Sequence, residues 1–219
     1  GINMLLEIKN VTKKFGSNDD VKDVSMTLES GKIYGFIGRN GSGKSVLLKM
    51  ICGFYVPTSG CILLDSYDYI ANNSFPNDTR ALIEKPSFLS DLTGFENLKL
   101  LASIKNEITD DDIKRTMEMV NLSNNDANKK YSKYSLGTKQ KLGIAQVLME
   151  NPKMLILDEP FNGVENETAN KIRKVLIEEK KKNKIIIIAS HIKEDIEKLA
   201  DVIYEFDNGI VKEKDEYEK

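Results

Sequence analysis

The residues from Gly38 to Ser45 have the types and spacing that bind phosphate. They read Gly-Arg-Asn-Gly-Ser-Gly-Lys-Ser and fit the pattern G-x-x-x-x-G-K-[ST]. The glycines allow the backbone to wrap a phosphate chain closely, with its N–H groups turned toward the anion. We expect Lys44 to contact the β- and γ-phosphates of a nucleotide, where it serves catalysis, and Ser45 to be a hydroxyl ligand of Mg²⁺. The predicted nucleotide contacts in and just after this loop are Gly38, Arg39, Asn40, Gly41, Ser42, Gly43, Lys44, Ser45 and Val46.

Two acids follow an aliphatic run of strand length. Residues 154–157 are apolar throughout, which is typical of a parallel strand buried on both faces, and Asp158 and Glu159 come directly after them. Sheets of α/β proteins bind ligands at the carboxyl ends of their strands. We therefore expect Asp158 to hold Mg²⁺ opposite Ser45 and Glu159 to act as general base on an attacking water. The alternative is that the acids only cap a turn before Pro160.

The single histidine, His191, also follows an aliphatic run, residues 185–189. A lone histidine is usually structural, but a place beyond a strand beside the nucleotide favours a catalytic contact to the γ-phosphate and water.

A second candidate anion site begins at Ser135, which would cap a helix with Gly137 in its first turn. The same two residues also fit an ordinary helix N-cap that holds no ligand.

The elements that must position these residues alternate between strands and helices. An apolar strand, 33–37, leads into the phosphate-binding loop, and a helix, 46–52, leaves it. The pattern is helical from 93 to 149, and strands on both sides of that block predict an α/β core with a helical insertion. Further strands are expected at 5–11, 24–28, 61–64, 80–83, 154–157 and 185–189, a helix at 165–182, and a hairpin over 202–211 closed by Asn208-Gly209.

Composition narrows the class of protein. Lys and Arg number 32 against 34 Asp and Glu, and the net charge of -2 argues against nucleic acid as a partner. The lysines of 180–184 are expected to be a solvated helix end.

Cys52 and Cys61 lack metal or redox spacing and are expected to be buried free thiols in a reducing compartment. No signal peptide or membrane-length apolar run is visible, so a cytoplasmic location is expected. Residues 1–3 are interpreted as a remnant of an expression tag.

Taken together, the chain from Met4 onward resembles the nucleotide-binding subunit of an ABC transporter. Residues 38–45 match the Walker A motif, 155–159 match Walker B, and Ser135 with Gly137 falls on the signature motif. His191 falls on the switch histidine, and Phe15 on the aromatic residue that stacks on adenine. The resemblance implies a P-loop NTPase: a RecA-like core with an antiparallel β subdomain and an inserted α-helical subdomain. It implies one domain over 1–219, with core segments 4–83 and 152–219 and a helical subdomain at 84–151.

Four departures from the family pattern indicate which group of ABC transporters the chain resembles. Leu136 replaces the first signature glycine and Thr138 its last position, and the loop after Walker B reads Asn-Gly-Val-Glu at 162–165. Glu84 stands where the family has a metal-contacting glutamine, so it is a further candidate Mg²⁺ ligand. A glutamate there, with a Ser-Leu-Gly signature, resembles the bacitracin-resistance and lantibiotic-immunity exporters. The alternative is that the chain belongs to some other exporter in which the glutamine has been replaced by glutamate without a change of group.

The resemblance also implies a mechanism and partners. Two copies, as a homodimer or heterodimer, would close head to tail around ATP and Mg²⁺, with Ser135 and Gly137 acting in trans. A separate transmembrane permease would dock near Glu84 to Asn97 and hold the chain at the inner face of the cell membrane. The chain ends soon after the strand at 210–211, so no added regulatory domain is expected. Rival readings are a soluble ABC ATPase of an assembly or repair complex, and an unrelated P-loop kinase or GTPase.

Overall fold

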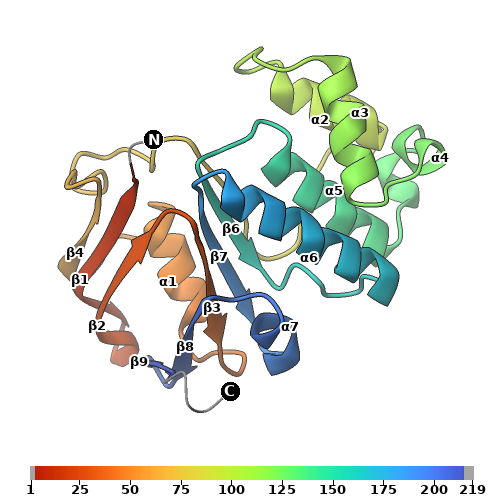
Figure 1. The fold of residues 1–219 in the computed structure, drawn as a ribbon. Coiled ribbons are helices and arrows are strands. Elements are labelled where there is room, and N and C mark those ends of the chain that lie inside the picture. The colour runs from red at the N-terminus through yellow and green to blue at the C-terminus, as the bar shows by residue number, and fades with distance from the viewer. Residues whose placement is uncertain (1–2, 215–219) are drawn as a thin grey trace.

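Two β-sheets and a set of helices make up the fold in Figure 1. The computed structural model describes residues 3–214. Residues 1 and 2, which were interpreted as part of an expression tag, and residues 215–219 lie outside the described residues. The antiparallel sheet has the order β2-β1-β4, and the larger sheet has the order β5-β6-β7-β3-β8-β9. The strands are β1 (Leu5–Phe15), β2 (Asn18–Glu29), β3 (Lys32–Ile37), β4 (Ser59–Leu64), β5 (Thr79–Leu82), β6 (Met154–Asp158), β7 (Ile185–Ser190), β8 (Val202–Asp207) and β9 (Ile210–Glu213).

The larger sheet separates two hydrophobic cores, because alternate residues of its strands face opposite sides. On β6, Met154 and Ile156 join the core that contains α1 (Lys44–Ile51) and the antiparallel sheet, whereas Leu155 and Leu157 join the other core. That second core contains α5 (Leu136–Leu148), α6 (Asn166–Lys181) and α7 (Lys193–Glu197). Burial on both faces explains why the central strands are aliphatic throughout.

The parallel register brings the carboxyl ends of four strands to one edge. Leu82 of β5 pairs with Leu157 of β6, Asp158 with Ala189 of β7, and Ser190 with Ile37 of β3. The residues that follow these strands therefore meet in space although they are far apart in the sequence. From the sequence, the site residues were expected at this end of the sheet, where the strands finish.

A helical block lies beside the sheet and beyond α5 (Figure 1). The predicted start at Thr93 is confirmed, because its side chain and that of Glu96 form a reciprocal capping box. A second capping box, between Thr109 and Asp112, begins the next helix. The helices of this block are α2 (Gly94–Ala102), α3 (Asp110–Met119) and α4 (Asn124–Ala127), followed by the 3₁₀ turn η1 (Tyr131–Lys133).

The structure differs from the sequence prediction at the first hairpin. The first strand was expected to end near Val11 and residues 16–20 to form a loop, but β1 and β2 stay paired as far as Phe15 and Asn18. Register shifts between Ile8 and Val11, and again further on, break the strict alternation that marks a strand in the sequence. The longer strand carries Phe15 out to the end of the hairpin.

Lys184 is a second difference. It was expected to belong to a solvated helix end, but only 3% of it is exposed. Its ammonium group donates hydrogen bonds to the carboxylate of Glu179 and, at 2.6 Å, to Asn151 Oδ1. The helix ends at Lys181, and the chain then turns Lys184 inward at the start of β7.

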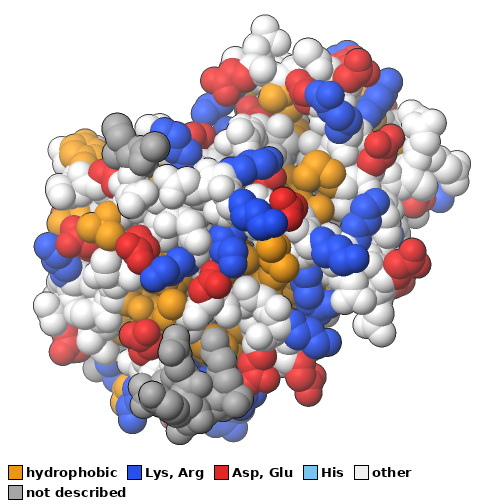
Figure 2. Space-filling view, in the orientation of Figure 1, with side chains coloured by type: hydrophobic (Ala, Val, Ile, Leu, Met, Phe, Trp, Pro, Cys, Tyr) orange, Lys and Arg blue, Asp and Glu red, His pale blue; other side chains and the backbone are white. Residues whose placement is uncertain are grey.

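The surface charge is mixed. On the face in Figure 2, Lys and Arg side chains lie interspersed with Asp and Glu. In residues 3–214, no helix combines the length and the apolar character that a membrane crossing requires.

Candidate functional site

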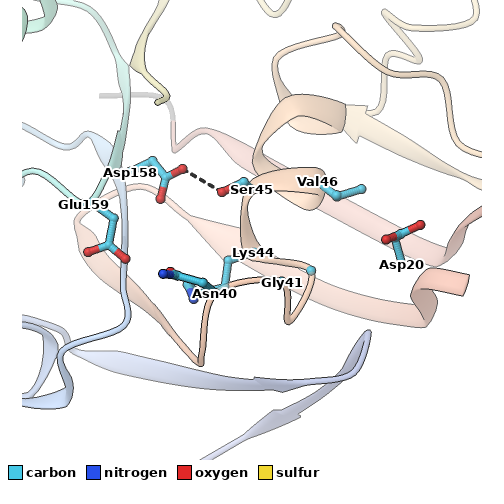
Figure 3. A pocket seen from close by; sticks show the side chains of 9 residues that line it. Asp20, Asn40, Gly41, Lys44, Ser45, Val46, Asp158 and Glu159 are labelled. Atoms are coloured by element: carbon cyan, nitrogen blue, oxygen red, sulfur yellow. Dashed lines mark hydrogen bonds between the residues drawn. The ribbon is translucent and has the colours of Figure 1, made fainter. Parts of the chain in front are cut away.

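The phosphate-binding loop joins β3 to α1 at the carboxyl edge of the sheet (Figure 3). Gly43 caps α1 with φ +110°, and a Cβ at this position would lie 2.6 Å from the backbone oxygen of Asp20. Glycine is therefore required here both by conformation and by space. The loop opens into a cavity of about 300 Å³, lined by Asp20, Asn40, Gly41, Gly43, Lys44, Ser45, Val46, Asp158 and Glu159.

Lys44 is folded back onto the loop. Its ammonium group donates hydrogen bonds to the backbone oxygen of Gly38 and, at 3.1 Å, to that of Arg39, and only 5% of the residue is exposed. Burial lowers the pKa of Lys44, and the carboxylates of Glu159 and Asp158 oppose that shift. Because the hydrogen-bond partners of this ammonium group among the described residues are backbone oxygens, an anion entering the loop would gain a strong interaction with it.

Ser45 and Asp158 meet across the cavity. The hydroxyl of Ser45 donates to Asp158 Oδ2 at 2.8 Å. Burial raises the pKa of Asp158, the nearby Glu159 and Glu84 raise it further, and the Ser45 hydrogen bond and Lys44 act against the rise. A cation between the two oxygens would relieve this electrostatic penalty.

This oxygen pair fits Mg²⁺, which is usually held by one or two carboxylates together with substrate phosphates and water. In the part of the chain that the structure describes, no group of three or more His, Cys, Asp or Glu residues forms a metal cluster. The remaining ligands would therefore have to come from a bound nucleotide and water. The donor set suits a metal that arrives with its substrate.

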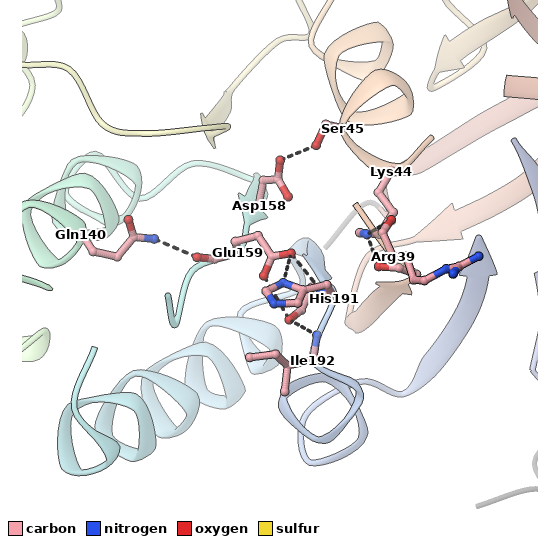
Figure 4. Close-up of polar contacts among 10 residues, drawn as sticks. Arg39, Lys44, Ser45, Gln140, Asp158, Glu159, His191 and Ile192 are labelled. Carbon is pink, nitrogen blue, oxygen red and sulfur yellow. Dashed lines mark hydrogen bonds and ion pairs between the residues drawn. The ribbon is translucent and has the colours of Figure 1, made fainter. Parts of the chain in front are cut away.

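Glu159 lies at the cavity wall and is held from two sides (Figure 4). Its Oε1 accepts a hydrogen bond at 2.8 Å from the backbone N–H of His191 and lies 2.8 Å from that residue's Nδ1. Ser190 donates to its Oε2 at 3.2 Å. On the backbone side, Gln140 of α5 donates to Glu159 O at 3.0 Å. The structure thus brings the predicted base and the predicted switch histidine into direct contact.

Phe15 lies outside the cavity, at the end of the first hairpin. It is 42% exposed, its ring is 5.2 Å from that of Tyr55 in an edge-to-face arrangement, and the Lys13 ammonium group lies 5.0 Å from its centroid. Phe15 does not line the phosphate cavity, so a nucleotide with its phosphates in the cavity would have to extend beyond it for its base to stack on this ring. That placement suits the predicted role of Phe15.

Glu84 follows β5 and has φ +65°, a conformation that a glutamate rarely adopts. Its carboxylate accepts a hydrogen bond from Lys49 of α1 and lies in an ion pair with it. The described contacts do not place it on Ser45, so its role as a metal ligand stays a prediction.

Ser135 and Gly137 begin α5, and neither lines the phosphate cavity of the same chain. The Ser135 hydroxyl accepts from the N–H of Thr138 at 3.2 Å, which is the predicted N-cap. A Cβ at Gly137 would lie 2.5 Å from the backbone oxygen of Gly163, and Leu136 packs on Gly163. Two departures from the family pattern, Leu136 and the 162–165 loop, therefore contact each other.

The prediction did not include four residues at this site. Asp20 lines the cavity, and its Oδ2 is buried with no partner in the described part of the chain. Gln140, Ser190 and Lys49 hold Glu159 or Glu84. Ser190 had one sequence signal, its place at the end of an aliphatic run, whereas Gln140 lies between two lysines and carries no such signal.

Comparisons with known proteins agree with this geometry. Residues 21–162 match the family model described as ABC transporter. The chain is 40% identical over 205 residues to the uncharacterized ABC transporter ATP-binding protein YybJ of Bacillus subtilis, with 94% of each chain covered. It is 38% identical to the bacitracin transport ATP-binding protein BcrA of Enterococcus faecalis, covering 91% of this chain and 65% of that protein. It is 32% identical to the lantibiotic transport ATP-binding protein SrtF of Streptococcus pyogenes, covering 96% and 91%.

Solved structures show the same fold. The ATP-binding subunit of an ABC transporter superposes with a TM-score of 0.84 at 25% identity, covering 95% of this chain and 90% of that one. A dimeric post-hydrolysis state of the ATP-binding cassette MJ0796, bound to ADP and Pi, superposes with a TM-score of 0.85 at 24% identity, covering 95% and 97%.

Proposed function

Because this chain belongs to the ABC transporter family of ATP-binding proteins, we propose that it powers the export of antimicrobial peptides or related drugs through a separate transmembrane permease. The chemistry of an ABC ATPase follows from family membership. The cargo is proposed from the bacitracin and lantibiotic transport relatives, and this chain spans only 65% of the length of the bacitracin relative.

One observation carries the proposed site: two oxygen donors, Ser45 and Asp158, lie 2.8 Å apart beside a glycine loop and a held carboxylate. The backbone N–H groups of the loop and Lys44 would bind the β- and γ-phosphates, and the α1 N-terminus adds its dipole. Lys44 would leave the backbone oxygens of Gly38 and Arg39 to do so. Ser45 and Asp158 would hold Mg²⁺, which neutralises phosphate charge when bound.

Glu159 is the proposed general base. Its carboxylate would accept a proton from the water that attacks the γ-phosphate. His191 and Ser190 fix the orientation of that carboxylate, and Gln140 fixes its peptide group. In this arrangement His191 acts as a positioning residue first, and a direct γ-phosphate contact would require the imidazole to turn away from Glu159.

The proposed working unit is a dimer. Ser135 and Gly137 lie apart from the phosphate cavity of their own chain, so they could contact a nucleotide only from a second copy or a related partner. A permease docked near residues 84–97 would place the chain at the inner face of the membrane. Closure of the dimer on ATP would then move the permease.

The first test of this function is co-purification. A tagged chain is isolated from gently solubilised membranes of its native cell, and we expect a multi-span permease to accompany it. A soluble partner with nothing from the membrane would overturn the transport role and leave the ATPase chemistry standing.

The second test is the Lys44→Ala variant. We expect ATP hydrolysis to fall by about 10²- to 10³-fold, as for loss of other charge-stabilising groups, and nucleotide binding to weaken. Hydrolysis is measured by phosphate release at saturating ATP. The matched control is Lys32→Ala, at the far end of β3, which should leave the rate unchanged. Normal turnover by Lys44→Ala would refute the site assignment.

A further inference from the structure

An ion pair outside the proposed hydrolysis chemistry joins Lys49 to Glu84. Lys49 lies one helical turn beyond Ser45 on α1, so both side chains leave the same face of the helix. Its side chain is 21% exposed and that of Glu84 is 65% exposed. The pair therefore ties the helix of the phosphate-binding loop to the segment that leaves the core for the helical block.

Glu84 also lies at the same end of the sheet as the proposed metal site. It follows β5 at the edge where Glu159 follows β6, because Leu82 pairs with Leu157 in the parallel register. On α1, Ser45 contacts Asp158 at the end of β6. One helical turn further on, Lys49 contacts Glu84 just after the neighbouring strand β5. The ammonium group of Lys49 is the cation that Glu84 contacts, and a metal ion between Ser45 and Asp158 would offer its carboxylate a second one.

Lys49 has a second partner that does not depend on Glu84. Its ammonium group lies 5.5 Å from the centroid of the Tyr55 ring, and Tyr55 in turn packs edge-on against Phe15. A cation over an aromatic face keeps part of its stabilisation when the carboxylate departs. Lys49 can therefore release Glu84 without becoming an isolated charge.

We propose that Lys49 is a positioning residue that competes with Mg²⁺ for the carboxylate of Glu84. In the nucleotide-free chain Lys49 holds Glu84 against α1, and when Mg-ATP binds, Glu84 moves to the metal while Lys49 stays over Tyr55. A neutral glutamine at position 84 would not form this ion pair. The inference rests on the proposed metal site, and it makes Lys49 one determinant of the Mg²⁺ concentration at which nucleotide binds tightly.

The test is equilibrium binding of a ribose-labelled fluorescent ATP, titrated with MgCl₂ from an EDTA baseline, in four full-length proteins. These are the unsubstituted chain, Lys49→Met, Glu84→Gln and the double variant. For a partly exposed ion pair we expect Lys49→Met to lower the Mg²⁺ midpoint about two- to fivefold when Glu84 is present. In the Glu84→Gln background the same substitution should leave the midpoint unchanged.

Two controls separate this effect from general electrostatics and from misfolding. Lys32→Met removes a lysine that pairs with Glu29 at the opposite end of the core, and it should not move the midpoint. Lys49→Arg keeps the charge and should restore the original midpoint. Retained ATP binding in EDTA shows that Lys49→Met is folded.

The outcomes discriminate between the proposals. An equal shift of the Mg²⁺ midpoint in both backgrounds, a rise of the midpoint, or no shift at all would overturn the competition. Each of those results would leave the ATP-binding function intact. Failure of the unsubstituted chain to bind the nucleotide at any Mg²⁺ concentration would overturn the proposed function and this inference together.

Discussion

The two ends of the parallel strands in the larger sheet differ in how their buried polar side chains are paired. At the carboxyl end, Asp158 is buried with a raised pKa, and Ser42 Oγ is buried with no hydrogen-bond partner among the described residues. At the amino end, Lys184 is also buried, but it is paired with Glu179 and hydrogen-bonded to Asn151. Lys184 therefore has a carboxylate partner, whereas among the described residues the hydrogen bond to Asp158 comes from the uncharged hydroxyl of Ser45.

Backbone conformation repeats this contrast. Glu159 and Glu84 follow their strands with φ +50° and +65°, and left-handed backbone costs about 1–2 kcal/mol for a residue with a side chain. At the amino end, positive φ is found at Asp78, Asn151 and Asn183, and Asp and Asn adopt this conformation more readily than Glu does. The difference indicates that the carboxyl end is organised for a ligand and the amino end for stability. Substitutions at the two ends should therefore separate activity from stability.

The largest expected effect is on catalysis, at the carboxyl end. Glu159→Gln removes the proposed base but keeps a side chain of the same shape for His191 to hold. ATP hydrolysis should fall by about 10²- to 10⁴-fold, while ATP binding persists and traps a dimer. Phosphate release and light scattering at saturating Mg-ATP measure the two effects. A hydrolysis rate near that of the unsubstituted chain would remove Glu159 from the mechanism.

The amino end should show the opposite result. Glu179→Ala leaves Lys184 as an uncompensated buried charge, so the free energy of unfolding should fall by about 3–5 kcal/mol. Glu178→Ala is the matched control, because Glu178 pairs with Lys181 on the exposed side of α6 and its loss should matter little. Denaturant unfolding measures stability, and ATP affinity of the folded protein should not change. A comparable loss in both variants would contradict the contrast.

The smallest expected effect is a gain in stability at the site itself. Asp158→Asn should raise the free energy of unfolding of the nucleotide-free chain by about 1 kcal/mol, because a buried charge among other carboxylates is removed. The same substitution should abolish Mg²⁺-dependent tightening of ATP binding. Denaturant unfolding without nucleotide provides the measurement. A less stable Asp158→Asn protein would mean that the carboxylate is structural.

The gain in unfolding free energy from Asp158→Asn should increase with pH. The folded pKa of Asp158 lies above its ordinary value of 3.8, so the folded state holds this proton more strongly than the unfolded state. Its contribution to stability is present below 3.8 and is lost as the pH rises through the folded pKa. The advantage of Asp158→Asn should therefore be small in acidic buffer and largest at neutral pH.

The parts of the site that could be predicted are those formed by residues close together in the sequence. The phosphate-binding loop was identified from the spacing of its glycines, lysine and serine. The acids at the end of β6 and the histidine after β7 were identified from an aliphatic run followed by polar residues. The P-loop NTPase fold, the ABC ATPase activity and the family are confirmed by the comparisons. The division into segments at 84 and 151 stays a prediction, because α5 packs on both the sheet and α3.

Contacts between distant residues could not be predicted from one sequence. Lys49 and Glu84 are 35 residues apart, and Ser190 and Glu159 are 31 apart, so only the register of the strands brings them together. The extent of the first hairpin was missed because β-bulges interrupt its alternation. Lys184 was misjudged for a similar reason, since its burial depends on how α6 meets β7.

The contact between His191 and Glu159 has a practical consequence for spectroscopy. The chain has one histidine, so a proton NMR spectrum would contain a single pair of imidazole resonances, and both come from the proposed catalytic centre. Any rearrangement of the carboxylate beside that ring would change the chemical shift of an isolated signal. The protein therefore carries a built-in reporter that can follow nucleotide binding, hydrolysis and release without any label.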